Sequence, residues 1–595
     1  MRVSTSVTAA ILILTGMTGT PAVTSVIDMA SQGIQQPDQI ESSEMRSYLE
    51  SFSTNRGSIT RFYNLNTSPV RLDRIERFFT EQQESQRNID FESMGRDGRI
   101  EYLLLNNLLT YELRNIKHQK ERIAEAAQLL PFAESIISLE ESRRRMEPVD
   151  PEEAATALDM MTTRIKDIRK ALEDSMKAKE EDEDLYISKS IIHRASQMAD
   201  DLKETLEHWF EYNSGYSPDF NWWASDPYEK TFKALEGYIE YIDEKILGFK
   251  EGEPDPIIGD PIGRQALLDE LEFEMITYSP EELIEIGERE YEWCLTELKR
   301  ASRELGYEDD WHAAMEYVKT LHVEPGEQDD LIRDLANEAI AFLDEHDMVT
   351  IPELARETWR IEMMSERAQQ STPFFTYGGQ RINVSFPTDE MTHEQKLMSM
   401  RGNNIHFSRA TVQHELIPGH HLQGFAGERY RTWRRPFRTA FLGEGWCLHW
   451  EMLLWDMDFP QSPENRIGML FWRIHRCARI IVSLKFHLGE MEIQEMIDFL
   501  VDNVGHEKDG ATGEVRRYVA GSYGPLYQCA YLVGGLQLRA LHRELVGSGR
   551  MTNREFHDTV LRENSIPVEM IRASLTGREL TSDYVAGWRF MEELR

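Results

Sequence analysis

The stretch QHELIPGHHLQ (residues 413–423) decides how the rest of this chain is interpreted. It places two imidazoles, His414 and His420, and the carboxylate of Glu415 within seven positions, and a third imidazole follows directly. A second carboxylate, Glu444, comes next in the run GEGW (residues 443–446). Two histidines, a later glutamate and a glutamate beside the first histidine are the parts of a zinc hydrolase, with three ligands and one base.

The spacing of the histidines differs from the usual pattern of ligands at i and i+4 on one helix. Position i+4 is Pro418, and the next histidines lie at i+6 and i+7. In an ideal helix His420 would be rotated by ~240° from His414, whereas His421 would be nearly in phase but ~10 Å further along the axis. Since Pro418-Gly419 disrupts regular helix, we expect a bulge or kink that returns His420 to the place of an i+4 ligand. Spacing alone leaves both His420 and His421 open.

Two further features favour a metal site over a helix with an exposed histidine pair. Residues 374–385 (FFTYGGQRINVS) alternate in polarity and predict one of the few strands or hairpins, of the kind along which zincins bind substrate. Glu444 lies 24 positions after His420 and is followed by Leu448 and Glu451, as an amphipathic second helix requires.

Three runs together resemble one known family. They are HELIPGHHLQ (residues 414–423), LGEGWCLHWE (442–451) and RRYVAGSYGPLYQCAYLVGGLQLRALH (516–542), and residues 255–294 look typical of one branch. The family is the domain of unknown function 885, which is grouped by motif with the gluzincin-type metallopeptidases. The resemblance covers roughly residues 40 to 590.

The resemblance implies the ligands and the base. The family pattern HExxPGH followed by EGW implies His414, His420 and Glu444 as ligands of one zinc ion, and Glu415 as the general base. It also implies a tyrosine as donor to the oxyanion, for which Tyr531 is the first choice.

Other candidates surround this set. Many relatives have Pro-Gly-Gln-Ala before the tyrosine, whereas this chain has GPLYQ (residues 524–528), so Tyr527 remains a rival to Tyr531. His487 matches a histidine common in relatives and is a candidate to assist the oxyanion. We further consider as substrate-binding residues, besides Tyr527, two carboxylate anchors and two positions on the expected strand: Arg517, Arg539, Tyr377 and Asn383. For each of these residues a purely structural role is the alternative.

Composition excludes several classes of protein. The 595 residues are 41% hydrophobic and 10% aromatic, which argues against disorder. The net charge of −38 argues against a nucleic-acid partner, because phosphate binding needs a basic face. Four widely spaced cysteines match no zinc motif and predict buried thiols, although one pair could bridge after export.

The N-terminus resembles an export signal. One arginine precedes the apolar run VTAAILILTG (residues 7–16), and small residues follow, so we expect a signal peptide over residues 1–25 and a periplasmic or extracellular protein. No other stretch is apolar for 18 residues, so no membrane span is expected.

Helical periodicity dominates the remainder. We expect helices over residues 100–130, 155–176, 187–209 and 231–247, a long loop over 212–223, and a capping box at residues 279–282. The Pro- and Gly-rich residues 251–263 predict a connection between an N-terminal helical region (26–250) and a catalytic helical region (251–595). The expected fold is therefore mostly α, a large helical zincin-like metallopeptidase fold with a deep cleft and a small β-sheet near the active site.

The sequence predicts a zinc-dependent hydrolase of peptide or amide bonds that acts on short peptides. The alternatives are a hydrolase of a non-peptide amide or ester, and a catalytically inactive helical binding protein. Substrate identity, oligomeric state and a metal other than zinc stay open.

Overall fold

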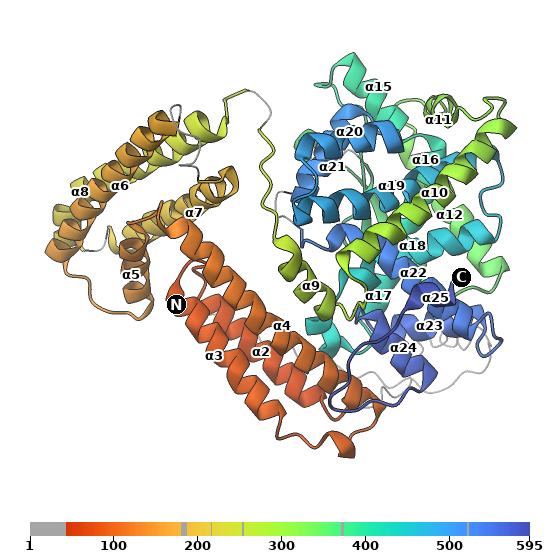
Figure 1. Cartoon of the computed structure of the whole chain (residues 1–595), viewed down its shortest axis with the longest axis horizontal. Coiled ribbons are helices and arrows are strands. Elements are labelled where there is room, and N and C mark those ends of the chain that lie inside the picture. Colours follow the sequence, from red (N-terminus) through yellow and green to blue (C-terminus); the bar gives the residue numbers. More distant parts are fainter. Residues whose placement is uncertain are drawn as a thin grey trace, which may run out of the picture.

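The computed structural model describes residues 43–179, 187–215, 217–252, 255–369, 374–519 and 523–594. The predicted signal peptide over residues 1–25 lies outside these ranges. The expectation of a mostly α fold with a small sheet is confirmed, because helices account for most of the described chain and the strands in it form one three-stranded sheet (Figure 1).

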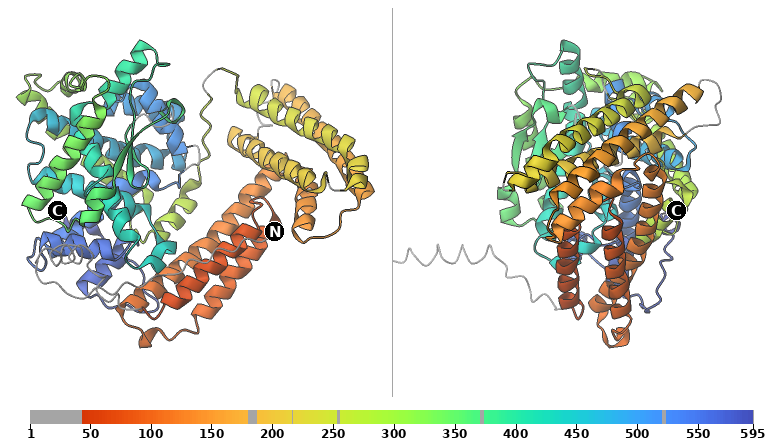
Figure 2. Two further views of the ribbon diagram at one scale, coloured as in Figure 1. Left: turned by 180° about the vertical axis from the view of Figure 1, so that it is seen from behind. Right: turned by 90° about the vertical axis from the view of Figure 1, so that its left-hand side faces the viewer.

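An N-terminal arm of long helices projects from the main body (Figures 1 and 2). Its first part contains α2 (Arg46–Phe62), α3 (Pro69–Gln86), η1 (Phe91–Ser93) and α4 (Arg96–Ala127). Its outer part contains α5 (Ala133–Arg144), α6 (Pro151–Lys179), α7 (Lys189–Asn213), α8 (Pro218–Glu240) and the π-helical η2 (Tyr241–Leu247).

The predicted long loop over residues 212–223 is wrong. The helix α7 continues to Asn213, and α8 begins at Pro218. The side chain of Ser217 accepts a hydrogen bond from Phe220 N, and proline suits the first turn because it has no N–H to satisfy. Serine and proline therefore begin a helix here instead of extending a loop.

The main body follows the connection at residues 251–263. Its first helices are α9 (Gly263–Phe273), α10 (Pro280–Glu304), α11 (Trp311–Lys319), α12 (Gln328–Glu345), α13 (Glu353–Thr358), α14 (Glu366–Gln369) and α15 (His393–Gly402). Those that contain the three motifs, and their neighbours, are α16 (Ile405–Glu415), α17 (His420–Gly427), η3 (Thr432–Phe437), α18 (Ala440–Asp456), α19 (Pro463–Leu488), α20 (Ile493–Val504), α21 (Lys508–Val519), α22 (Tyr527–Leu545), α23 (Asn553–Arg562), α24 (Val568–Thr576) and α25 (Phe590–Glu593). The predicted capping box at Ser279 and Glu282 begins α10.

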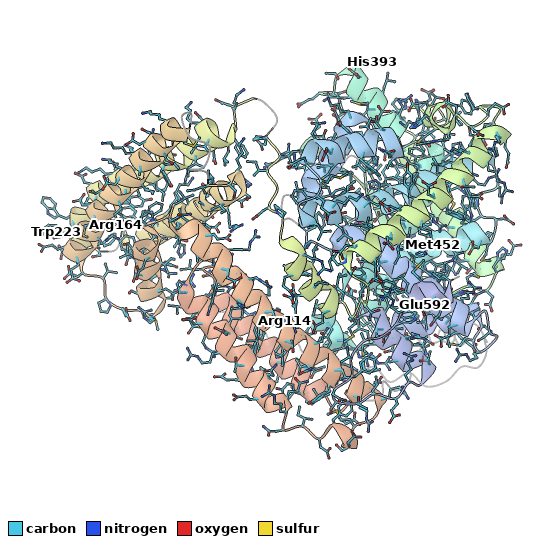
Figure 3. The ribbon with its side chains drawn as sticks, in the orientation of Figure 1. Arg114, Arg164, Trp223, His393, Met452 and Glu592 are labelled. Carbon is cyan, nitrogen blue, oxygen red and sulfur yellow. The ribbon has the colours of Figure 1, made fainter. Side chains whose placement is uncertain are left out.

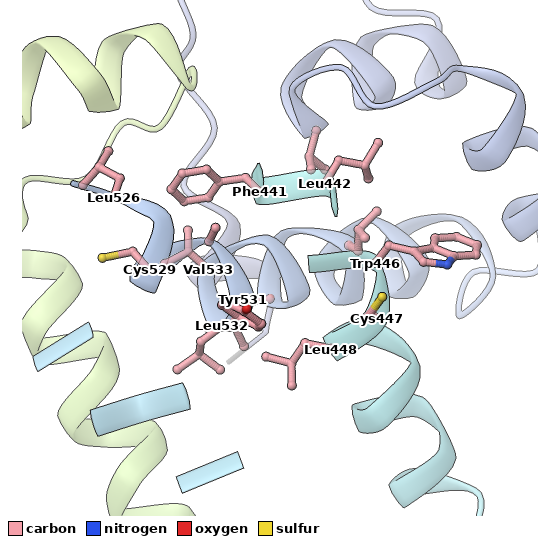
Figure 4. Close-up of a cluster of buried hydrophobic side chains, with 14 of the residues drawn as sticks. Phe441, Leu442, Trp446, Cys447, Leu448, Leu526, Cys529, Tyr531, Leu532 and Val533 are labelled. Atoms are coloured by element: carbon pink, nitrogen blue, oxygen red, sulfur yellow. The ribbon is translucent and has the colours of Figure 1, made fainter. Parts of the chain in front are cut away.

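Close approach of two helices organises this body. A Cβ on Gly534 of α22 would lie 1.8 Å from the Phe441 carbonyl oxygen of α18, and a Cβ on Gly445 would lie 2.5 Å from Gly534 C. Without side chains at these points the two backbones approach closely, and apolar residues of both helices, such as Trp446 and Leu532, pack around the contact (Figure 4).

The sheet lies beside the motif helices. Its strands are β1 (Arg360–Met363), β2 (Thr376–Tyr377) and β3 (Arg381–Val384), in the order β1-β3-β2. β2 and β3 are antiparallel and form the predicted hairpin, whereas β1 pairs in parallel with β3. β1 was not predicted, because a run of four residues is too short to indicate a strand and these four are largely exposed.

The buried cores divide the chain differently from the predicted boundary at residue 250. Buried residues of α5–α8 and the end of α4 form a separate core, whereas those of α2, α3 and most of α4 belong to the core of the main body. Ion pairs also cross the predicted boundary at residue 250. Arg114 of α4, labelled in Figure 3, contacts Glu272 of α9 at 2.7 Å. The buried Arg434 of η3 contacts Glu101 of α4 at 2.8 Å.

Two further expectations concern the whole chain. All four cysteines are free and buried, as predicted. Among the described helices, none has the length and apolar character needed to cross a bilayer.

Candidate metal centre

The proline–glycine step ends one helix and permits another to start. α16 ends at Glu415 and α17 starts at His420. Four non-helical residues therefore separate two helices, where a bulge or kink within one helix was expected. A Cβ on Gly419 would lie 1.7 Å from the carbonyl oxygen of His414, so only glycine fits at this point of the turn. Trp446 of α18 donates its indole N–H to the Pro418 carbonyl oxygen at 2.8 Å and fixes the turn against α18.

The turn brings three predicted ligands together. Oε2 of Glu444 lies 3.5 Å from Nε2 of His414 and 3.3 Å from Nε2 of His420. His421 points elsewhere, since its Nε2 lies 2.8 Å from the Ala355 carbonyl oxygen. Of the two histidines that spacing left open, His420 is the one that faces the glutamate.

These separations suit a tetrahedral zinc ion. Ligand bonds of about 2.0–2.1 Å at tetrahedral angles place neighbouring ligand atoms about 3.3–3.4 Å apart, close to both distances at Glu444. Both distances exceed the usual 2.7–3.2 Å of an N–H···O hydrogen bond. Oε2 of Glu444 is also buried and has no hydrogen-bond partner among the described residues. The donor set therefore fits a zinc ion.

A neighbouring carboxylate orients His414. Nδ1 of this histidine lies 2.7 Å from Oε1 of the buried Glu451, which leaves Nε2 to face Glu444. Burial lowers the pKa of His414, but the neighbouring carboxylates of Glu444 and Glu451 outweigh burial and raise it to about 9. The site thus attracts positive charge at Nε2, which a metal ion supplies as well as a proton does. Glu444 is oriented in turn by the hydroxyl of Tyr527, which donates to Oε1.

Cys447 is a second candidate for the third ligand, because atoms of His414, His420 and Cys447 lie within 4.8 Å of one another. Its sulfur, however, lies 3.4 Å from Nδ1 of His420, the nitrogen on the opposite side of the ring from Nε2. Burial raises the pKa of the Cys447 thiol well above its usual range, and Glu444 adds to the shift. Glu444 is therefore the better third ligand, and Cys447 orients His420.

The ligands line a cavity of about 320 Å³ that also contains the predicted base. Glu415 is partly buried, and its Oε2 accepts a hydrogen bond from the Tyr377 backbone N–H of β2 at 2.9 Å. Burial raises the pKa of Glu415, while His414 and His420 oppose the shift. The ring of Tyr531 stacks 6.0 Å from that of His414. The cavity is also lined by Tyr377, Tyr527, Arg476, Arg479 and Arg517.

Three predicted residues lie elsewhere. His487 is in the last turn of α19, about 12 Å along the helix axis from Arg479, and its charged neighbours are Asp260 and Arg122. Its assignment to the oxyanion is wrong on geometry, because helical spacing separates it from the cavity. Arg539 is half-exposed and contacts Asp456 at 2.8 Å, which makes it a structural ion pair. Asn383 of β3 donates to Thr376 Oγ1 at 3.4 Å and does not line the cavity.

Four charged residues that line or support the site were not predicted: Glu451, Arg476, Arg479 and Glu514. A signal for two of them is present in the run RIHRCARI (residues 473–480), where charged residues recur every third position in an otherwise apolar helix. Such residues are costly to bury without a partner, so their burial points to a site.

Comparison with known proteins agrees with the resemblance stated above. The model of the family described as "Bacterial protein of unknown function (DUF885)" matches residues 64–575, and the chain belongs to this family. No match was found among curated proteins.

Two solved structures share the fold. One is described as "a putative lipoprotein of unknown function from Shewanella oneidensis"; it is 16% identical, with a TM-score of 0.65, and the alignment covers 90% of this chain and 100% of that chain. The other is described as "the putative lipoprotein from Colwellia psychrerythraea"; it is 14% identical, with a TM-score of 0.57, and the alignment covers 90% of this chain and 98% of that chain.

Proposed function

We propose that this protein is a zinc-dependent hydrolase of peptide or amide bonds that acts on short peptides. The observation that carries the proposal is the convergence of His414, His420 and Glu444 in one cavity, with Glu415 beside them. His414, His420 and Glu444 would hold the ion, and Glu451, Tyr527 and Cys447 orient these ligands. Zinc supplies Lewis acidity that makes water a nucleophile near neutral pH.

The residues of the chain supply the proton transfers and the charge stabilisation. Glu415 accepts a proton from the attacking water and passes it to the leaving amine. The Tyr377 N–H holds one carboxylate oxygen of Glu415, so the other oxygen is available for this transfer. Tyr531 donates a hydrogen bond to the carbonyl oxygen that gains negative charge.

We also propose that the protein is exported. Both solved structures of similar fold are described in terms of lipoproteins, as quoted above. An apolar run behind one arginine begins this chain, which favours a periplasmic or extracellular location.

The substitution Glu415→Gln tests the proposed chemistry. It removes the base but keeps the size of the side chain, so the hydrolysis rate of a mixed tripeptide pool should fall about 10²- to 10⁴-fold. Metal analysis should still find about one zinc ion per chain, because Glu415 is not one of the three ligands.

The control for this test is Glu428→Gln, the same change at an exposed position on the C-cap of α17. It should leave both zinc content and rate unchanged. The proposal fails if the zinc-supplemented protein binds no metal and hydrolyses none of the peptides, or if Glu415→Gln keeps its activity.

A further inference from the structure

One wall of the metal cavity is basic, in a chain that is strongly acidic. The chain has 104 acidic and 66 basic residues, yet this wall presents three arginines and one glutamate. The residues are Arg476 and Arg479 of α19, and Arg517 and Glu514 of α21. Positive charge therefore exceeds negative charge on this wall, while the other carboxylates of the cavity, Glu415, Glu444 and Glu451, lie at the metal ligands. A buried cation without a partner favours binding of an anion.

Two of the three arginines already have a carboxylate partner. Glu514 contacts Arg479 at 2.7 Å and Arg517 at 2.9 Å. Tyr518 also contacts Arg479, since its hydroxyl oxygen accepts from Nε at 3.1 Å. Glu514 therefore neutralises part of this wall and fixes Arg479 and Arg517 in place.

Arg476 has no carboxylate partner at ion-pair distance among the described residues, and Glu415 of the same cavity acts on it only through longer-range electrostatics. Arg476 is only 7% exposed, and its Nε is buried without a hydrogen-bond partner. None of the hydrogen bonds or ion pairs found among the described residues involves Arg476. Its guanidinium instead lies over two rings, 4.4 Å from the centre of Tyr531 and 5.2 Å from that of Trp472. Aromatic faces stabilise a cation but satisfy none of its N–H donors.

Arg476 is also close to the catalytic residues. Tyr531 packs against the guanidinium, and the ring of the same tyrosine stacks 6.0 Å from that of His414. One or two residues of extended peptide span about 3.5 or 7 Å. A peptide whose scissile carbonyl lies at the ligands can therefore reach Arg476 with its own C-terminus.

We propose that Arg476 binds the free C-terminal carboxylate of a short peptide, so that cleavage occurs one or two residues from the C-terminus. The planar guanidinium offers a fork of N–H donors that matches a carboxylate. Arg479, whose second terminal nitrogen (Nη1) is buried and unbonded, adds charge on the same wall. The inference rests on the proposed function for its cleavage position, but binding of the carboxylate does not depend on turnover.

The test measures binding without hydrolysis. Zinc-loaded Glu415→Gln protein is incubated with randomised tripeptides, either as free acids or as C-terminal amides, and the retained peptides are quantified by mass spectrometry. Free acids should be retained roughly 10- to 100-fold better than amides, as expected for a hydrogen bond between charged groups. Adding Arg476→Gln should remove this preference.

Matched variants separate the role of the charge from structural damage. Arg476→Lys should keep part of the preference, and Arg476→Met, which packs between the same two rings, should lose it while keeping zinc content and thermal stability. Arg466→Gln makes the same change on α19 at a partly exposed residue that pairs with Glu304, outside the cavity, and should retain the preference.

Several outcomes would overturn the inference. These are equal retention of acids and amides, absence of retained peptide, a preference that survives both Arg476→Gln and Arg476→Met, and retention of amides containing Asp or Glu as strongly as free acids. The last outcome would assign Arg476 to an acidic side chain. Acid preference without hydrolysis by the wild-type protein would refute the proposed function alone, and equal cleavage of acids and amides would refute this inference alone.

Discussion

At the scale of single residues, the set of metal ligands depends on which histidine side chains face Glu444. The motif predicted His414, Glu444 and one of two adjacent histidines, but it could not choose between His420 and His421. That choice depends on the path of four turn residues and on the distant Ala355 carbonyl, which accepts from His421. A contact between residues so far apart in the sequence cannot be predicted from the local spacing of the motif.

Substitution of Glu451 tests how strongly a supporting carboxylate holds the metal. Glu451→Ala removes the partner of His414 Nδ1, so zinc affinity should fall about 10- to 100-fold. Glu451→Gln keeps an acceptor oxygen and should lose less. Competition with a chelator measures both affinities, and equal affinity in the wild type and Glu451→Ala would contradict the assigned role.

At the scale of elements, helices were predicted well wherever apolar residues recur with helical period. Failures occurred at short or irregular segments. The exposed strand β1 forms only because β3 pairs with it, and α8 starts at a Ser-Pro step inside a predicted loop. The close approach of α18 and α22 could not be predicted either. It depends on two glycines in different motifs, and their contact is visible only in the folded structure.

Gly419→Ala tests the junction between α16 and α17. The added Cβ would clash with the His414 carbonyl oxygen, so the turn must open. The free energy of unfolding should fall by about 3 kcal/mol, and zinc affinity should fall with it. Denaturant unfolding and zinc titration measure the two effects.

Gly443→Ala is the matched control for this substitution. A Cβ there meets no atom within 4 Å, and alanine in the helix α18 should stabilise by up to about 1 kcal/mol. A Gly419→Ala protein with normal stability and zinc affinity would show that the turn tolerates a side chain.

The contribution of the contact between Glu274 and α18 to the stability of the protein should depend on pH. Glu274 follows α9 and accepts a hydrogen bond from Thr439, the N-cap of α18, and burial raises the pKa of Glu274 to about 8. The folded protein therefore keeps a proton that the unfolded chain releases near pH 4.5. Its contribution to stability is fully present below pH 4.5 and is lost as the pH rises through 8.

Glu274→Gln mimics the protonated side chain and should remove this dependence. Its melting temperature relative to wild type should rise between pH 5.5 and pH 8.5. Glu272→Gln, on the exposed side of α9, should show no such trend. A constant difference between wild type and Glu274→Gln at both pH values would contradict the raised pKa.

At the scale of the whole molecule, the packing across the Pro- and Gly-rich residues 251–263 could not be predicted from local sequence. A boundary near residue 250 followed from local composition, whereas α2–α4 contribute to the core of the main body. Such long-range association depends on buried groups like Arg434 and Glu101, which are 333 positions apart. No window of sequence contains both.

Two cores predict two transitions in calorimetry, since separate cores need not unfold together. A hundredfold excess of zinc over its dissociation constant should stabilise only the main body, by about 2.7 kcal/mol, and a chelator should reverse the shift. Ile165→Ala, in the separate core, identifies the other transition by lowering it alone. A single unfolding transition, or a shift of both transitions on addition of zinc, would contradict the division into two cores.

The contact between β2 and Glu415 has a consequence for how relatives can diverge. The group that holds the base belongs to the peptide backbone at position 377, so exchange of the tyrosine for most other amino acids leaves that donor intact. Proline is the exception, because it has no amide hydrogen to give. As far as the contact with Glu415 is concerned, homologues can carry any side chain at this site except that of the one imino acid.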